Sequence, residues 1–129
     1  MSSNVVKLND KGKALCDEVW KDTSLWEKNY KLAISLFLKA YTQFPENIVV
    51  LTNLGAALSD IGKHRDALSY LQKAERIGTN DSNLYFNIAV AKMNIDSATR
   101  KEAIVYFNKA SKLISNPMTL RAYFDPMAH

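Results

Sequence analysis

Apolar residues recur along this chain with the alternating spacing of three and four that is typical of amphipathic helices. The clearest case lies between residues 24 and 44, where one helix face is predicted to consist of Trp26, Tyr30, Ala33, Phe37 and Ala40. Ser24 and Glu27 have the spacing of a capping box, which would satisfy the free amides at the start of this helix. Pro45 cannot continue it. The pattern therefore predicts a long helix over this range.

Similar patterns predict four more helices in the second two thirds of the chain. They are expected near residues 47–60, 64–77, 82–94 and 99–115. Gly62 and Gly78 provide turn and stop signals, and Asn116-Pro117 ends the last helix. No segment alternates with the period of a strand. The chain is thus predicted to form antiparallel helix pairs joined by short turns.

Three near-copies of one eight-residue segment occur, at residues 33–40, 67–74 and 103–110. Each copy begins and ends with alanine, and the copies begin 34 and then 36 residues apart. A fixed period of this length indicates a stacked array, because one such unit cannot bury its apolar face alone.

The residues of the middle unit resemble the tetratricopeptide repeat, a 34-residue helix-turn-helix family. The resemblance rests on Leu51, Leu54, Gly55, Leu58, Gly62, Ala67, Leu71 and Ala74, and in the third unit on Tyr85, Ile88, Ala89, Ala103, Phe107 and Ala110. It implies one all-α domain, a helical-hairpin repeat array or α-solenoid, with repeats at about 5–46, 47–80 and 81–117. A cap is expected over 118–129, with a short helix from Met118 to Phe124. Such arrays need a terminal cap.

The first helix of the first unit departs from the family pattern. Two apolar faces are open to it: Leu8, Gly12 and Leu15, or alternatively Cys16, Val19 and Trp20. The sequence does not choose between them.

Composition agrees with a globular domain, since 47% of residues are hydrophobic and 23% are charged. No apolar run reaches the length of a membrane span, and the first ten residues lack the apolar region of a secretory signal. The only cysteine, Cys16, cannot form an internal disulfide. A cytoplasmic location without membrane contact is therefore expected.

The net charge of +4 is concentrated near the C-terminal end of the chain. The cations there are Lys92, Arg100, Lys101, Lys109, Lys112 and Arg121. They favour an acidic protein partner, although scattered cations on solvated helix faces explain them as well. No basic tract interleaved with aromatics indicates nucleic acid.

No constellation of side chains indicates catalysis, a metal or a cofactor. His64 and His129 lie far apart, and Cys16 has no neighbour at metal-ligand spacing. Phosphate loops and nucleophile elbows are absent from the sequence. We therefore expect a protein that is not an enzyme.

Function is then expected on the concave surface, which the first helix of each pair lines. Asn53 and Asn87 are 34 residues apart and should project from equivalent positions. An amide side chain donates and accepts, which suits an extended peptide backbone, and some tetratricopeptide proteins use such an asparagine ladder. Asparagine is also common on ordinary polar helix faces. The other predicted binding residues are Thr52, Asn83, Phe86, Val90 and Asn94.

Phe86 and Val90 form an apolar strip beside Asn87. This strip could receive an anchor residue of a partner, or the C-terminal segment could cover it. The favoured function is a module that binds a protein segment in its groove, as an adaptor, chaperone or inhibitor. The alternatives are a self-associating structural module, such as a homodimer through Trp20, Trp26 or Phe124, and a bacterial immunity or secretion-chaperone protein.

Overall fold

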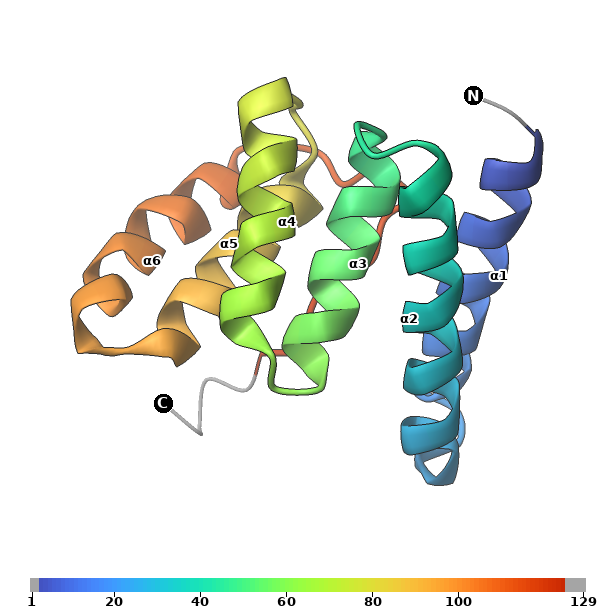
Figure 1. The fold of residues 1–129 in the computed structure, drawn as a ribbon. Coiled ribbons are helices and arrows are strands. Elements are labelled where there is room, and N and C mark those ends of the chain that lie inside the picture. The colour runs from blue at the N-terminus through green and yellow to red at the C-terminus, as the bar shows by residue number, and fades with distance from the viewer. Residues whose placement is uncertain (1–2, 125–129) are drawn as a thin grey trace.

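The computed structural model describes residues 3–124. This part of the chain contains no strand and consists of helices joined by short turns (Figure 1). The helices are α1 (Ser3–Glu18), α2 (Trp26–Gln43), α3 (Ile48–Asp60), α4 (His64–Ile77), α5 (Ser82–Ile95) and α6 (Ser97–Ser111), with a short 3-10 turn η1 (Thr23–Leu25) before α2.

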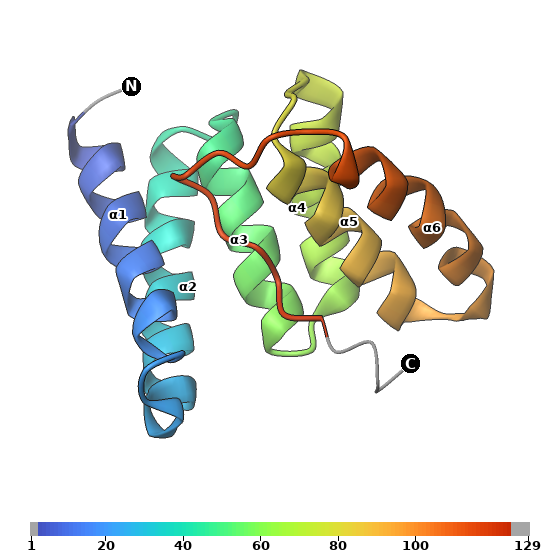
Figure 2. The same ribbon diagram turned by 180° about the vertical axis from the view of Figure 1, so that it is seen from behind.

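Consecutive helices pair as α1 with α2, α3 with α4 and α5 with α6, and the pairs stack in chain order (Figure 1). The predicted all-α repeat array is confirmed. Figure 2 shows the opposite side, where the segment that follows α6 crosses the array and runs along α3. We call residues 116–124 the tail, and the surface of α1, α3 and α5 against which it lies the groove.

Helix starts are set by side chains that accept from free backbone amides. Asn47, Asp81 and Asp96 cap α3, α5 and α6, and the cap at Asp96 forms a capping box with Thr99. The box predicted at Ser24 and Glu27 is wrong. Asp22 instead accepts from the Ser24 amide and starts η1, so the chain enters α2 through a 3-10 turn without a side-chain cap.

The buried face of α1 combines the two alternatives that the sequence left open. It consists of Val5, Asn9, Gly12 and Cys16, and Val19 in the turn after the helix extends it, so that the steps alternate between four and three. Trp20 lies outside this face and is 63% exposed. Gly12 permits close packing, because a Cβ there would lie 2.6 Å from Phe37 Cε1 of α2.

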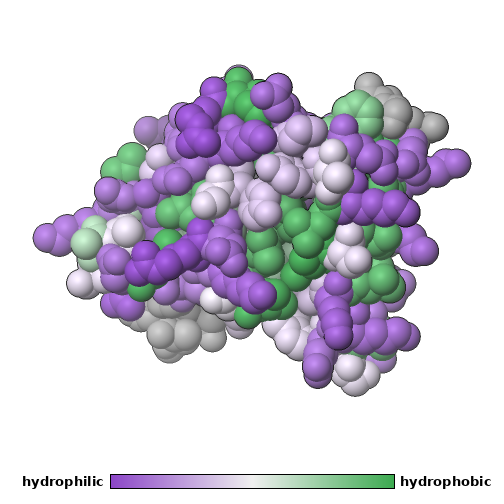
Figure 3. Space-filling model, in the orientation of Figure 1, coloured by the Kyte–Doolittle hydropathy of each residue, from purple (hydrophilic) through white to green (hydrophobic). Residues whose placement is uncertain are grey.

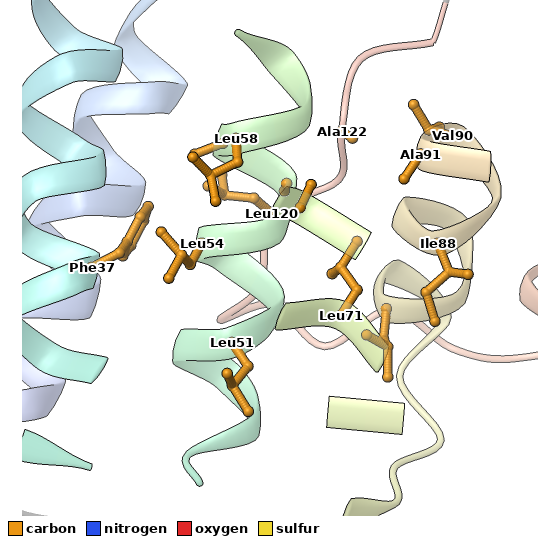
Figure 4. Packing of buried hydrophobic residues seen from close by; sticks show 14 of the residues in the cluster. Phe37, Leu51, Leu54, Leu58, Leu71, Ile88, Val90, Ala91, Leu120 and Ala122 are labelled. Carbon is orange, nitrogen blue, oxygen red and sulfur yellow. The ribbon is translucent and has the colours of Figure 1, made fainter. Parts of the chain in front are cut away.

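Helices α3 and α5 are buried almost all the way round, because partner helices cover one side and the tail covers the other. Their core positions hold large aliphatic residues such as Leu51, Leu54 and Ile88, with small residues where helices approach closely (Figure 4). Figure 3 shows the face opposite the tail, where an apolar area over α3 is surrounded by polar surface.

Gly55→Ala should destabilise the protein by about 1–3 kcal/mol, because overpacking a well-packed core costs this much. A Cβ at this position would overlap the side chain of the fully buried Leu71. Urea denaturation midpoints would measure the change. Ser35→Ala, at an exposed position of α2, is the control and should shift stability by no more than about 0.5 kcal/mol. Equal midpoints for both variants would contradict the close contact between α3 and α4.

Candidate functional site

The tail differs from the sequence prediction, which expected a short helix from Met118 to Phe124. This segment contains no helix: it begins in a turn and is extended from residue 120 onward, and residues 125–129 of the predicted cap lie outside the described residues. So short a helix would be marginal alone, since its first turn must be nucleated for few hydrogen bonds. In the groove, the backbone instead pairs with side chains of the array.

Asn53 of α3 pairs with the tail through both ends of its amide. Its Oδ1 accepts from the Leu120 amide at 2.6 Å, and its Nδ2 donates to the Met118 carbonyl at 3.1 Å. Two groups of the tail backbone that face the same side are thus satisfied by one side chain.

Asn87 of α5 repeats this arrangement two residues further along the tail. Its Oδ1 accepts from the Ala122 amide at 2.7 Å, and its Nδ2 donates to the Leu120 carbonyl at 2.9 Å. Alternate residues of an extended chain direct their backbone groups to the same side. The two asparagines therefore form equivalent rungs of a ladder along one edge of the tail.

The side chains of the tail alternate in the way an extended segment requires. Leu120 and Ala122 are 8% and 2% exposed and join the core cluster between α3 and α5 (Figure 4). Arg121 and Tyr123 lie on the exposed side. The groove thus binds the backbone through amides and receives every second side chain.

Asn9 of α1 adds a contact that sequence reasoning missed. Its Oδ1 accepts from Asn53 Nδ2 at 2.7 Å, and its own Nδ2 lies 3.5 Å from the Met118 carbonyl. An asparagine at this position of the first helix could have indicated the contact. It lies 44 residues before Asn53, however, whereas Asn53 and Asn87 are 34 residues apart.

A turn at the start of the tail is anchored to the beginning of α5. Asp81 Oδ1 accepts from the Asn116 amide at 2.9 Å, and its Oδ2 accepts from Thr119 Oγ1 at 2.7 Å. Asn83 Nδ2 donates to the Thr119 carbonyl at 3.2 Å. Asp81 therefore both caps α5 and holds the tail where it enters the groove.

Asp60, at the end of α3, holds the other end of the tail. Its Oδ1 accepts from the Tyr123 amide and its Oδ2 from Tyr30 Oη, at 2.7 and 2.6 Å. Burial raises the pKa of Asp60 to about 6, although both hydrogen bonds favour the charged form. The burial of Tyr30 and its proximity to Asp60 raise the pKa of that phenol as well.

Asp60 should make stability fall as pH rises from about 4 to 6. Its folded pKa lies above the ordinary value of 3.8, so the folded state binds the proton more tightly than the unfolded state in this range. The stabilising contribution is complete below pH 4 and is lost as pH rises through the folded pKa. Asp60→Asn should remove it, and the stability difference between variant and wild type should change by at most about 3 kcal/mol between pH 4 and 7.

Urea midpoints of both proteins across this pH range would test the effect. Asp66→Asn, at an exposed position of α4, is the matched control and should follow the wild-type curve. A pH dependence that persists in Asp60→Asn would assign it to other groups.

The tail covers Phe86, which was one of the two alternatives that the sequence left open for the apolar strip. The Arg121 guanidinium lies 4.4 Å from the centre of the Phe86 ring, and the ring of Phe124 packs against Phe86 and Phe107. Val90 is buried beside Phe86. The strip is therefore occupied in this structure rather than open.

Thr52 and Asn94 do not take part in the ladder. Their side chains donate to carbonyls of their own helices, Thr52 to Ile48 and Asn94 to Val90. Of the predicted residues, the structure thus brings Asn53, Asn83 and Asn87 onto the tail backbone and Phe86 onto its side chains.

Cys16 and the basic residues offer little chemistry of their own. Burial raises the pKa of the Cys16 thiol to about 12, which disfavours the reactive thiolate. Several predicted cations have internal contacts: Lys92 pairs with Glu102 at 2.6 Å, and Lys109 lies over the Tyr85 ring. Within residues 3–124, no group of three acidic, histidine or cysteine side chains could hold a metal ion. None of the described helices has the length and apolar character needed to cross a bilayer.

The stacked antiparallel helix pairs and the groove define a tetratricopeptide-like helical repeat array. Among solved structures, the chain is similar to one titled "MamA MSR-1 C2", a protein that contains tetratricopeptide repeats. The TM-score is 0.56 at 23% sequence identity, over 78% of this chain and 64% of that one, so this chain spans less than two thirds of its neighbour. A likeness at this identity concerns the fold. No protein-family model and no curated protein matches the sequence.

Proposed function

We propose that this protein is a non-catalytic interaction module of the tetratricopeptide family that holds an extended protein segment in its groove. The two equivalent rungs carry this proposal. Asn53 and Asn87 each bind a backbone amide and a backbone carbonyl, two residues apart along the bound segment. Backbone groups are common to all sequences, so the same rungs suit a segment from another protein.

The groove in this structure holds the protein's own tail, so a partner segment has to take the place of the tail. A tethered segment competes at an effective concentration that reaches millimolar for short linkers. Affinity for a partner should therefore depend on how firmly the tail is docked. Adaptor, chaperone and inhibitor roles are all compatible with such a groove.

The experiment uses a full-length variant in which the tail is released. Leu120→Asp places a charge at a buried tail position and leaves every groove residue unchanged. A fluorescently labelled peptide with the sequence of residues 116–124 is the probe, and anisotropy reports its binding. We expect binding at micromolar concentrations to the released variant and at least tenfold weaker binding to wild type.

Adding Asn53→Ala and Asn87→Ala to the released variant should weaken peptide binding by at least tenfold. Asn108→Ala, at an exposed position of α6, is the matched control and should leave binding unchanged. Circular dichroism checks that each variant keeps its helices. A released variant that is folded but does not bind the peptide would refute a groove that accepts a segment in trans.

An acidic partner and a cytoplasmic location are finer parts of this proposal. The acidic partner is supported by the exposed Lys101 and Lys112, and the location by the single buried thiol of Cys16. Neither the charge of the partner nor the location of the protein changes the hydrogen bonds of the ladder.

A further inference from the structure

An apolar pocket lies at the end of the groove, beside Tyr123, whose amide donates to Asp60. It has a volume of about 430 Å³ and is lined by Val19, Trp20, Thr23, Trp26, Tyr30 and Tyr123. This volume lies in the range of ordinary ligand pockets. The walls come from the turn after α1, the 3-10 turn η1 and the start of α2, with the tail on one side.

Two tryptophans on this pocket are unusually exposed for their size. Trp20 and Trp26 are 63% and 39% exposed. The Trp26 ring packs on Tyr30 at 4.4 Å between ring centres, so Tyr30 supports it from the same helix. Tryptophan in such positions is typical of residues that dominate binding energy at interfaces.

The tail only partly uses this pocket. Tyr123 contacts Trp20 with ring centres 5.8 Å apart, and Tyr123 remains 54% exposed. Asp60 accepts hydrogen bonds from the Tyr123 amide and from Tyr30 Oη. One side chain therefore contacts both the tail backbone and a residue that lines the pocket. The pocket is therefore continuous with the peptide-binding surface.

We propose that this pocket anchors a large apolar side chain of a partner protein whose extended segment replaces the tail on the ladder. The inference rests on the proposed function. The tail indicates the chemistry of that segment: an aliphatic residue where Leu120 lies, a small residue where Ala122 lies, and a bulky aromatic residue directly after it. The bulky residue fills space that Tyr123 leaves open, which gives the partner an advantage over the tail.

A different protein fits this role better than a second copy of the chain. The tail of a second copy carries the same side chains and would make the contacts that the resident tail already makes. It would also lose the benefit of the tether, since association costs translational and rotational freedom. Only a segment with a better anchor gains from the exchange.

The test uses the Leu120→Asp chain and three labelled peptides based on residues 116–124. The position of Tyr123 is kept as tyrosine, changed by Tyr123→Ala, or changed by Tyr123→Trp. We expect the tryptophan peptide to bind at least threefold more tightly than the tyrosine peptide and at least tenfold more tightly than the alanine peptide. Trp20 and Trp26 are the two tryptophans of the chain, so their fluorescence should shift to the blue with the tyrosine peptide.

Trp26→Ala in the receptor should remove most of the discrimination among the three peptides. Phe44→Ala is the matched control, because Phe44 is similarly exposed but lies after the other end of α2. Equal affinities of the three peptides would overturn the anchor site while leaving the proposed function intact. Failure of all three to bind would instead refute the proposed function.

Sedimentation of the wild-type chain between 10 and about 100 μM separates the two possible sources of the segment. A monomer throughout, with tighter binding of the tryptophan peptide, supports a different protein as the partner. A dimer that Leu120→Asp abolishes would overturn that choice in favour of tail exchange between copies.

Discussion

Replacing both Asn53 and Asn87 by alanine should release the tail and lower the free energy of unfolding by about 2–5 kcal/mol. Both side chains are fully buried, and together they make four hydrogen bonds to the tail backbone. A buried neutral hydrogen bond contributes about 0.5–1.5 kcal/mol. The sequence analysis expected both residues on the concave surface, and the structure shows that they are fully buried there beneath the tail.

Urea midpoints of wild type, the double variant and the Asn108→Ala control would measure the loss. The same substitutions should cost much less in the Leu120→Asp background, where the tail has already left the rungs. Such non-additivity is expected of residues that act on one shared element. Equal losses in both backgrounds would show that the asparagines stabilise the array independently of the tail.

Leu120→Asp should lower the free energy of unfolding by about 2–4 kcal/mol. Leu120 is 8% exposed, and an unpaired carboxylate is costly in an apolar core. The tail can avoid this cost by leaving the groove, so the loss is limited to the free energy with which it docks. Hydrogen exchange would show the release directly, because the amides of Leu120 and Ala122 donate to the two rungs.

Ile114→Asp is the matched control for this variant. It makes the same kind of change at a position that is 88% exposed and precedes the tail. We expect its stability and its exchange at Leu120 and Ala122 to match wild type. Protected amides at these two positions in Leu120→Asp would mean that the ladder holds the tail even without the buried leucine.

The helices were predictable because their signals are local. The three-and-four spacing and the turn glycines Gly62 and Gly78 placed α3 and α4 closely, and the repeat period indicated the stacking. The caps were less predictable. Asp22 and Ser24 compete to start a helix two residues apart, and only the packed geometry decides between them.

The groove was predictable in position but not in what it holds. The period of 34 residues brought Asn53 and Asn87 to equivalent positions, whereas Asn9 was missed because the first repeat does not share the period. The conformation of the tail has no local signal. Its extended backbone depends on rungs that lie between 33 and 67 residues earlier in the chain. The sequence analysis expected a short helix there because repeat arrays need a terminal cap.

The contact between Asn9 and the tail changes how this array should be expected to fold. In a repeat array each repeat contacts only its neighbours, so the helix pairs can form or fray one at a time. Here residue 118 returns to residue 9, a separation of 109 positions, and the tail touches all three helix pairs. Such a closure raises contact order, which slows folding. It also joins the two ends of the array, so that opening of the first pair and release of the tail become parts of one cooperative event.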